Sequence, residues 1–216
     1  MPLVNAKCTN CGGTLQVDAA KEAAVCPFCG SAFIVEKAIQ NYNIVNNIQA
    51  NVVNIYGAQQ KDYVINGGVL TEYKGESVNA VLPDTVHGIG PKAFADCKYL
   101  ESVTFPSSLK SIEEGAFYRC ENLKEISFPQ GLQSIGDCAF AFCNGLQRVK
   151  IPSSVKTVGH CAFFKCDSLT EAVFEEGVQT IGALAFYECP SLKKIVLPKS
   201  LKTVLPLAFY DCPNLT

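Results

Sequence analysis

Twelve cysteines are the residues in this 216-residue chain whose type and spacing could do the most chemistry. Four of them form two pairs of the pattern C-x2-C, Cys8 with Cys11 and Cys26 with Cys29. Thiolates are strong ligands for Zn²⁺, and four of them complete its tetrahedral shell without leaving an open position for a substrate. The spacing therefore predicts one structural Zn²⁺ ion, and not a catalytic one, bound by Cys8, Cys11, Cys26 and Cys29.

The residues around the two pairs predict a small β unit that the ion would hold together. Residues 14–17 and 22–25 favour a hairpin, and residues 31–35 a third short strand. So short a unit buries too little surface to fold alone, whereas zinc contributes on the order of 10–16 kcal/mol in comparable peptides. The pattern resembles the zinc-ribbon family over residues 5–36, and we assign residues 1–37 to this unit. Rubredoxin-like iron and a pair of disulfides are the alternatives to zinc.

Charge argues against nucleic acid as the partner of this unit. The whole chain has a net charge of −2, and the lysines near the cysteine pairs are offset by carboxylates, as the sets Lys7, Lys21, Lys37 and Asp18, Glu22, Glu36 show. A zinc ion with four thiolates is itself negative, so the unit presents no face that would neutralise phosphates. We expect a structural or protein-docking ribbon, with a nucleic-acid-associated regulator as the runner-up.

The other eight cysteines fall at two repeating positions. Six of them recur at one position: Cys97, Cys120, Cys143, Cys166, Cys189 and Cys212. A zinc–thiolate protein belongs in a reducing compartment, so we expect these six to be small buried apolar residues and not disulfides. Cys138 and Cys161 share a second, more exposed turn position, and they are the pair expected to oxidise first.

The cysteines belong to a 23-residue period that runs through the second half of the chain without an insertion. Phenylalanines and leucines repeat with them, at Phe94, Phe117, Phe140, Phe163, Phe186, Phe209 and at Leu100, Leu123, Leu146, Leu169, Leu192, Leu215. A fixed period places equivalent residues above one another when the coils stack. We therefore expect the phenylalanines to form a buried aromatic spine.

One copy of the repeat shows how a coil would be built. Its segment Leu-x-x-Ile-x-Phe predicts a strand that ends at Pro129, which has no N–H to donate. Leu132 and Ile135 give a second inward-facing pair, and Gly136 would allow a turn. Residues 139–143 would then return the chain in one helical turn.

The repeat is similar to the BspA-like leucine-rich repeat family, as in I-P-S-S-V-K-T-V-G-H-C-A-F-F-K-C-D-S-L at residues 151–169. The resemblance covers residues 78–216. It implies a fold that is mainly β with short helical turns, a right-handed leucine-rich-repeat solenoid of six 23-residue coils behind the ribbon. Residues 62–77 look like the hairpin that commonly caps such arrays.

Departures from the repeat predict local irregularity. Glu175 replaces the proline that ends a strand, while Glu113 and Leu205-Pro206 replace the turn glycine of their coils. The sequence stops at Thr216 without a polar closing repeat, so the last coil is a candidate for self-association.

A second candidate for self-association is the segment between the two predicted units. Residues 38–61 form an Asn-rich linker or strand segment, and its first 23 residues carry no charged side chain. The mixture of asparagine and β-branched residues at 40–56 favours short strands that would pair with the solenoid edge or with a second chain.

Histidine is the residue type that could suggest acid–base catalysis, and there are two copies of it. His87 shares its repeat position with a solvated set: Lys110, Gln133, Lys156, Gln179 and Lys202. His160 lies in a variable turn, where we expect no nucleophile or carboxylate beside it. Without a phosphate-binding loop either, the sequence predicts a protein that is not an enzyme.

Two rows of variable side chains are the predicted partner-binding surface. The outward strand positions contribute Glu125, Arg148, Lys150, Glu171 and Lys194, and the position after each spine phenylalanine contributes Tyr118, Phe164, Tyr187 and Tyr210. Aromatic and arginine side chains are enriched at interaction hot spots. The alternative for the aromatic row is packing between neighbouring coils.

These patterns together favour a scaffold that binds an unidentified protein. No export signal or run of about 18 apolar residues is present, so we expect a cytoplasmic protein without a membrane segment. A cell-surface adhesin is a further alternative, because relatives of the repeat family are often surface proteins.

Overall fold

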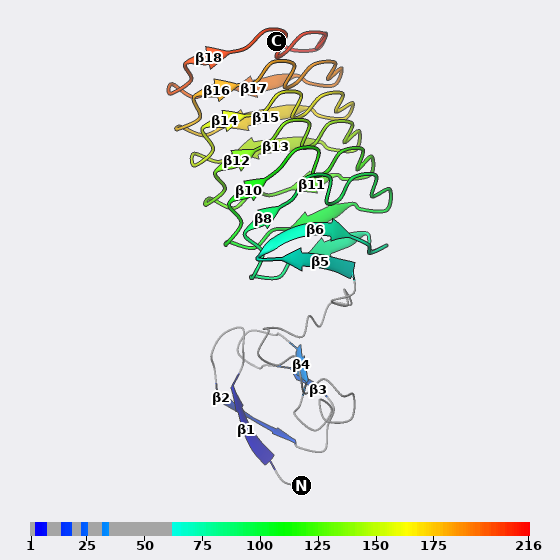
Figure 1. The fold of residues 1–216 in the computed structure, drawn as a ribbon. Helices are drawn as coiled ribbons and strands as arrows, with labels where there is room; N and C mark the ends of the chain where they lie inside the picture. Colours follow the sequence, from blue (N-terminus) through cyan, green and yellow to red (C-terminus); the bar gives the residue numbers. More distant parts are fainter. Residues whose placement is uncertain (1–2, 8–13, 19–22, 26–31, 35–61) are drawn as a thin grey trace. The chain divides into compact units, whose positions relative to one another are not determined.

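A computed structural model describes residues 3–7, 14–18, 23–25, 32–34 and 62–216 (Figure 1). The chain divides into two compact units, Met1–Gly57 and Ala58–Thr216. The described residues form strands joined by turns and contain no helix. The segment 40–56, predicted to self-associate, lies outside the described residues.

Four short strands are described in the first unit. β1 (Leu3–Lys7) pairs antiparallel with β2 (Thr14–Asp18), and β3 (Ala23–Val25) pairs antiparallel with β4 (Ala32–Ile34). The predicted hairpin between the second and third of these strands is therefore wrong. The N-terminal strand, which the sequence analysis did not assign, offers β2 five paired residues, whereas β3 is three residues long.

The second unit begins with a hairpin, β5 (Tyr63–Asn66) and β6 (Val69–Tyr73), whose turn holds Gly67 and Gly68 at positive φ. β6 then pairs in parallel with the first coil. The resulting eight-stranded sheet contains the hairpin and one two-residue strand from each coil: β8 (Gly88–Ile89), β10 (Ser111–Ile112), β12 (Ser134–Ile135), β14 (Thr157–Val158), β16 (Thr180–Ile181) and β18 (Thr203–Val204). Figure 1 shows these strands stacked along the solenoid.

A second row of parallel strands forms two separate three-stranded sheets. The first contains β7 (Asn79–Val81), β9 (Ser102–Thr104) and β11 (Glu125–Ile126), and the second contains β13 (Arg148–Ile151), β15 (Glu171–Phe174) and β17 (Lys194–Val196). Within each sheet, every strand pairs with the residues one period away in the next coil. The predicted stacking of 23-residue coils in register is confirmed.

The predicted aromatic spine is confirmed and extends beyond the coils. Five of its rings are fully buried and lie 4.8–5.3 Å from their neighbours, with planes within 14° of parallel: Phe94, Phe117, Phe140, Phe163 and Phe186. Phe209 continues the stack at 5.4 Å. At the other end, Tyr73 packs on Phe94 at 4.8 Å and Tyr63 on Tyr73 at 5.3 Å. The hairpin therefore covers the first coil with aromatic rings of its own.

The segment that returns each coil is not the predicted helical turn. Around Phe140, both Cys138 (φ 52) and Phe142 (φ 62) adopt left-handed backbone. The amides of these three residues donate to carbonyls of the next coil at 2.8 Å, whereas a helix would direct its amides along its own axis. The same two turn positions are left-handed in the other coils, at Lys92, Asp96, Gly115, Arg119, Cys161, Lys165, Leu184, Glu188, Leu207 and Asp211.

Glycine at the predicted turn position serves close packing between coils. A Cβ at Gly136 would lie 2.8 Å from the carbonyl carbon of Glu113, and one at Gly159 would lie 2.5 Å from that of Gly136. The prediction that Glu113 and Leu205 disturb their coils is wrong, because their amides donate to the preceding coil at 2.9 and 3.0 Å, as that of Gly136 does at 2.8 Å.

Glu175 does produce the irregularity predicted for it. Its N–H, which a proline would lack, donates to the carbonyl of Ile151 at 2.9 Å, so the hydrogen-bond ladder of β15 continues past the usual strand end. The chain then turns at Gly177, with φ 124, where a Cβ would lie 2.3 Å from the carbonyl oxygen of Ser153.

Candidate interaction surfaces

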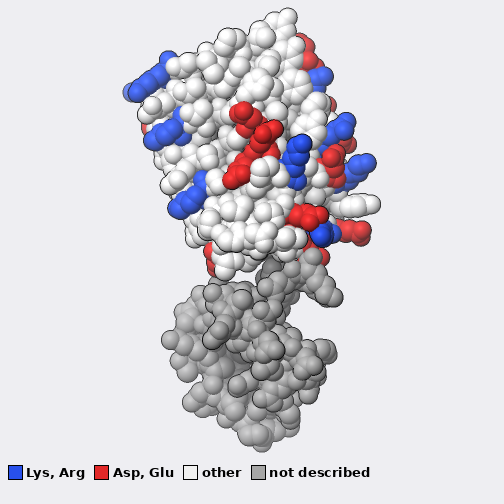
Figure 2. Space-filling view, in the orientation of Figure 1, with Lys and Arg blue, Asp and Glu red and all other residues white. Residues whose placement is uncertain are grey.

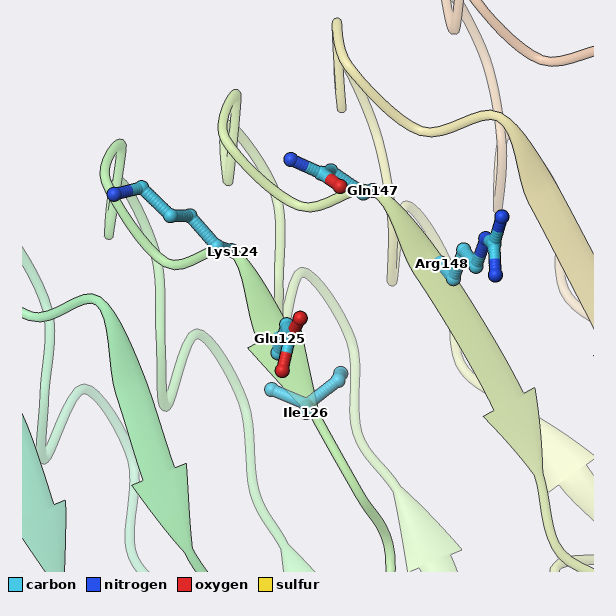
Figure 3. Close-up of a pocket in the computed structure, with 5 residues that line it drawn as sticks. All are labelled: Lys124, Glu125, Ile126, Gln147 and Arg148. Carbon is cyan, nitrogen blue, oxygen red and sulfur yellow. The ribbon is translucent and has the colours of Figure 1, made fainter.

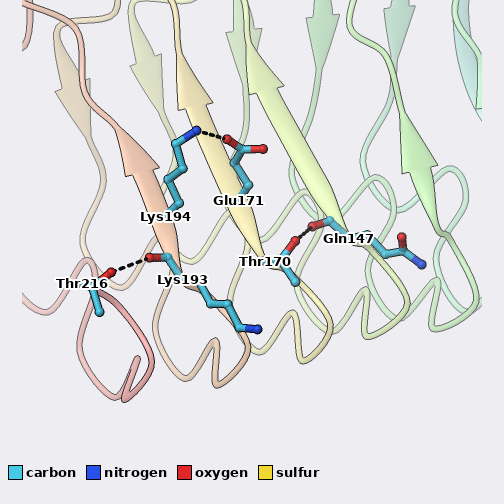
Figure 4. A network of polar contacts seen from close by, with 6 residues as sticks. All are labelled: Gln147, Thr170, Glu171, Lys193, Lys194 and Thr216. Carbon is cyan, nitrogen blue, oxygen red and sulfur yellow. Dashed lines mark hydrogen bonds and ion pairs between the residues drawn. The ribbon is translucent and has the colours of Figure 1, made fainter.

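The outward residues of the second three-stranded sheet alternate in charge. Arg148, Glu171 and Lys194 are in register on β13, β15 and β17. Lys194 Nζ lies 2.7 Å from Glu171 Oε1 (Figure 4), and this contact lowers the pKa of Glu171. In the same network the hydroxyl of Thr170 donates to the carbonyl of Gln147 at 3.0 Å. The sheet therefore presents charges in a fixed order.

Lys150, another predicted partner-binding residue, is held by a carboxylate from the next coil. Its Nζ lies 2.7 Å from Oε1 of Glu175, and the amide of Ser153 donates to Oε2 of the same carboxylate at 3.0 Å. The Lys150 contact, followed by the Ser153 hydrogen bond, lowers the pKa of Glu175. Because its charge is paired within the surface, Lys150 is less available to a partner than Arg148.

The outward row of strands is interrupted between β11 and β13, which do not pair. The ladder between these coils stops at Gln147, whose amide donates to the carbonyl of Lys124 at 3.2 Å. The interruption opens a hollow of about 250 Å³, whose lining is shown in Figure 3: Lys124, Glu125, Ile126, Gln147 and Arg148. Two predicted partner-binding residues, Glu125 and Arg148, thus line a discontinuity that the sequence did not predict.

Apolar and charged groups meet in this hollow. Ile126 is half-buried, although Val103 and Val149, at the same position in the flanking coils, are buried. Glu125 has no ion-pair partner among residues 62–216, since Arg148 extends away from it (Figure 3). The hollow therefore combines an accessible aliphatic side chain with an unpaired carboxylate.

Charge over the solenoid is mixed in sign. Figure 2 shows acidic and basic side chains interspersed along one edge of the second unit and separate basic side chains along the opposite edge. On the described surface Lys124 pairs with Glu101 at 2.8 Å. The face in Figure 2 thus offers no broad basic patch of the kind that phosphate binding requires.

A second row of aromatic rings lies outside the spine, on the return segments. Neighbouring rings are 5.4 or 5.5 Å apart in the order Tyr118, Phe142, Phe164, Tyr187, Tyr210. All are half-buried except Tyr210, which is 57 % exposed. Phe142 was not predicted as a member of this row because Ala141 holds the expected position, and the ring joins the row from the next residue.

Cations are packed against this outer aromatic row. The guanidinium of Arg119 lies 5.9 Å from the ring centres of both Tyr118 and Phe142, and Lys165 Nζ lies 5.6 Å from that of Phe164. Lys165 also pairs with Glu188 at 2.8 Å. The rings are therefore held by their neighbours, as the packing alternative expected, while part of each remains open to a partner.

Five of the six repeating cysteines are hydrogen-bond donors as well as small core residues. Cys120, Cys143, Cys166 and Cys189 are fully buried, and Cys97 and Cys212 are half-buried. All except the first donate their thiol to the carbonyl of the spine phenylalanine in the preceding coil, at 3.0–3.3 Å. Burial raises the pKa of Cys143 and of Cys166. These thiols form hydrogen bonds that link neighbouring coils.

Cys138 and Cys161 are half-exposed and belong to successive coils. Sγ of Cys161 lies 3.2 Å from Nε2 of His160, so the expectation that no nucleophile lies beside this histidine is wrong. Cys161 has left-handed backbone, with φ 53. Asp137 accepts the amide of His160 at 2.8 Å. Burial, and then the neighbouring Cys138, raises the pKa of Cys161 to about 11.

The predicted metal ligands Cys8, Cys11, Cys26 and Cys29 lie outside the described residues. Within the part of the chain that the structure describes, no group of three or more His, Cys, Asp or Glu side chains is arranged to hold a metal ion. The same part contains no helix long and apolar enough to cross a bilayer. The zinc site therefore stays a prediction.

Stacked coils, a buried aromatic spine and parallel strands in register define a leucine-rich-repeat solenoid. The family model described as "BspA type Leucine rich repeat region" matches residues 79–216 in six copies. The chain therefore belongs to the BspA-type leucine-rich repeat family, which confirms that part of the sequence resemblance.

Solved structures of similar proteins support the same fold. A leucine-rich repeat protein from T. pallidum is 26% identical with a TM-score of 0.63, and the match covers 74% of this chain and 90% of that one. One from Eubacterium ventriosum is 27% identical with a TM-score of 0.66, covering 74% of this chain and 46% of that one. No match was found among curated proteins.

Proposed function

We propose that this protein is a non-catalytic scaffold that binds a protein partner through the outward strand face of its solenoid. The observation that carries the proposal is the interruption between β11 and β13. There Glu125 is unpaired within the described surface and Ile126 is half-exposed. A carboxylate beside an aliphatic side chain suits a lysine or arginine of the partner, which would place its stem on Ile126 and its charge on Glu125.

The second three-stranded sheet would extend this contact. Arg148 is exposed beside the hollow, and Glu171 and Lys194 follow it in register. Alternating charges favour a partner segment with the complementary order, because like charges placed opposite one another are unfavourable. The outer aromatic row, with Tyr187 near its end, is a second part of the proposed surface.

Quantitative capture with the intact chain tests the proposal. Proteins retained by the immobilised wild type are compared with those retained by Glu125→Lys, Arg148→Glu and Tyr187→Ala. Lys156→Glu, in a solvated position outside both rows, is the matched control. A genuine partner is retained by wild type and control and loses about tenfold or more in affinity with Glu125→Lys. Equal retention by wild type, control and all three variants contradicts the proposed face.

We also propose that Cys8, Cys11, Cys26 and Cys29 bind one structural Zn²⁺. In support, each C-x2-C pair lies in the connection of an antiparallel strand pair, β1 with β2 and β3 with β4. Metal analysis of the purified chain should give one zinc per chain. Cys26→Ser should lose zinc and the order of the first unit, while the solenoid keeps its melting temperature. Iron, or no metal in the fully reduced chain, would contradict the assignment.

A further inference from the structure

Cys138 and Cys161 are placed differently from the buried cysteine column. Both are half-exposed, and both have almost the same left-handed backbone, with φ 52 and 53. The amide of Cys138 donates to the carbonyl of His160 at 2.8 Å, so the two cysteines are neighbours across one inter-coil step. Adjacent chains at about 4.8 Å lie within the backbone separation that a disulfide tolerates.

The described surroundings of the pair place an imidazole nitrogen beside one thiol and no backbone carbonyl that either thiol donates to. Nε2 of His160 lies 3.2 Å from Sγ of Cys161. Within residues 62–216, neither thiol of the pair donates to a backbone carbonyl, whereas the buried column from Cys120 to Cys189 does so in every coil. The half-exposed pair is therefore the one in this part of the chain whose sulfurs are free to approach each other.

We propose that Cys138 and Cys161 form a reversible modification site, a dithiol that a disulfide-class oxidant converts into a cross-link between two coils. The Cys161 sulfur passes its proton to His160 Nε2 as it attacks one sulfur of the oxidant; a mixed disulfide forms, the oxidant's S–S bond breaks, and the departing thiolate takes the proton back from His160 to leave as the first reduced thiol. The Cys138 sulfur then displaces the second half of the oxidant and gives up its proton to that thiolate. One disulfide replaces another, and two protons and two electrons leave on the two reduced thiols.

Oxidised glutathione and peptide mapping test this site in the full chain. Native protein is treated with oxidised glutathione, blocked with N-ethylmaleimide, digested with trypsin and sequenced by mass spectrometry. The expected product links Cys161 to Cys138. Fragment ions must distinguish Cys138 from Cys143, because no lysine or arginine separates them. The product should disappear with dithiothreitol, and it should lose its selectivity when the oxidation is carried out in denaturant.

Variants separate the two steps of the reaction. Cys138→Ser should trap a glutathione adduct on Cys161, and His160→Gln should slow cross-linking several-fold without changing its end point. An unchanged rate would remove the role of His160. Cys212 is the internal control: its thiol is also half-exposed, yet its neighbour Cys189 is buried. Alkylation of Cys138 and Cys161 as separate thiols after oxidation, or stable adducts on both, would overturn the proposal.

Discussion

The inner and outer faces of the return segments both carry phenylalanine and cysteine, but the side chains on the two faces differ in burial and in their contacts. On the inner face, Phe140 and Cys143 are fully buried, with the ring in the spine and the thiol on a backbone carbonyl. On the outer face, Phe164 and Cys161 are half-exposed, with one ring in the outer row and one thiol beside His160. Residues that point to the two faces are neighbours in the sequence of one return segment, as Phe163 and Phe164 show.

This difference shows that the 23-residue repeat sets the spacing of equivalent side chains, whereas the position within the coil sets how buried they are and what they contact. Every coil repeats at nearly the same rise, so any residue type placed once per coil becomes a stack. A stack inside the coil gains from complete removal from water, whereas one outside keeps its edges or sulfurs accessible. An aromatic or thiol ladder can therefore not be assigned a role from the repeat alone.

The largest effect is expected when the inner aromatic column is broken. Phe140→Ala removes a fully buried ring that stacks on Phe117 at 5.0 Å and on Phe163 at 5.3 Å. The cavity and the lost transfer free energy should lower the free energy of unfolding by about 3–5 kcal/mol. Urea unfolding followed by circular dichroism measures the change; a variant as stable as wild type would show that the spine is not a core element.

The outer aromatic column should be more tolerant. Phe164→Ala removes a half-exposed ring that stacks on Tyr187 at 5.4 Å, so we expect a loss of about 1–2 kcal/mol. The same unfolding measurement, carried out beside Phe140→Ala, gives the ratio of the two effects. Equal losses would mean that both columns belong to one core and would weaken the outer row as a binding surface.

Substitution of a buried cysteine should lower the free energy of unfolding more than substitution of a half-exposed one, by a smaller margin than between the two aromatic residues. Cys143→Ala leaves the carbonyl of Phe117 without its thiol donor and opens a small void, which should cost about 1–2 kcal/mol. Cys138→Ala, at a half-exposed turn, should change stability by less than about 0.5 kcal/mol under reducing conditions. Thermal unfolding of both variants in the presence of a reductant checks the order, and a reversed order would contradict the assignment of the columns.

The smallest effect concerns acid stability on the outward strand face. The pKa of Glu175 is lowered in the folded state by Lys150 and Ser153, so its contribution to stability is present above the ordinary carboxyl pKa near 4.5 and is lost as the pH falls through the lowered value. In Glu175→Gln the acid limb of the stability profile should therefore be flatter. Melting temperatures from pH 3 to 7 test this, with Glu113→Gln as an exposed control; an equally steep acid limb in Glu175→Gln would contradict the role of this carboxylate.

The sequence predicted what the period controls and missed what depends on backbone conformation. Register, the buried spine and the alignment of Arg148, Glu171 and Lys194 all follow from equal spacing. The left-handed turns were missed because, apart from Gly115, Asp96 and Asp211, the residues at these positions are not glycine, asparagine or aspartate, the types that usually signal such backbone. Position, not composition, forces positive φ there, since alternate amides must reach the next coil.

Unpredicted backbone conformation also accompanies the features of the candidate sites that the sequence did not predict. Phe142 joins the outer row from an unexpected position, and the thiol of Cys161 lies beside His160. Both Phe142 and Cys161 have left-handed backbone, which the sequence did not predict. The interruption between β11 and β13 has no sequence signature that we can name, although its lining residues Glu125 and Arg148 were predicted from their outward strand positions.

The left-handed turn positions also bear on how such a protein can change over generations. The backbone there is unfavourable for any residue with a side chain, and the coil accepts lysine, cysteine, leucine, arginine, aspartate and glutamate alike. Exchange among the longer side chains leaves this conformational cost nearly the same, so the cost alone does not choose among them. Side chains at these positions can therefore be exchanged while the coil keeps its fold, and Cys138 and Cys161 are two residues placed in this way.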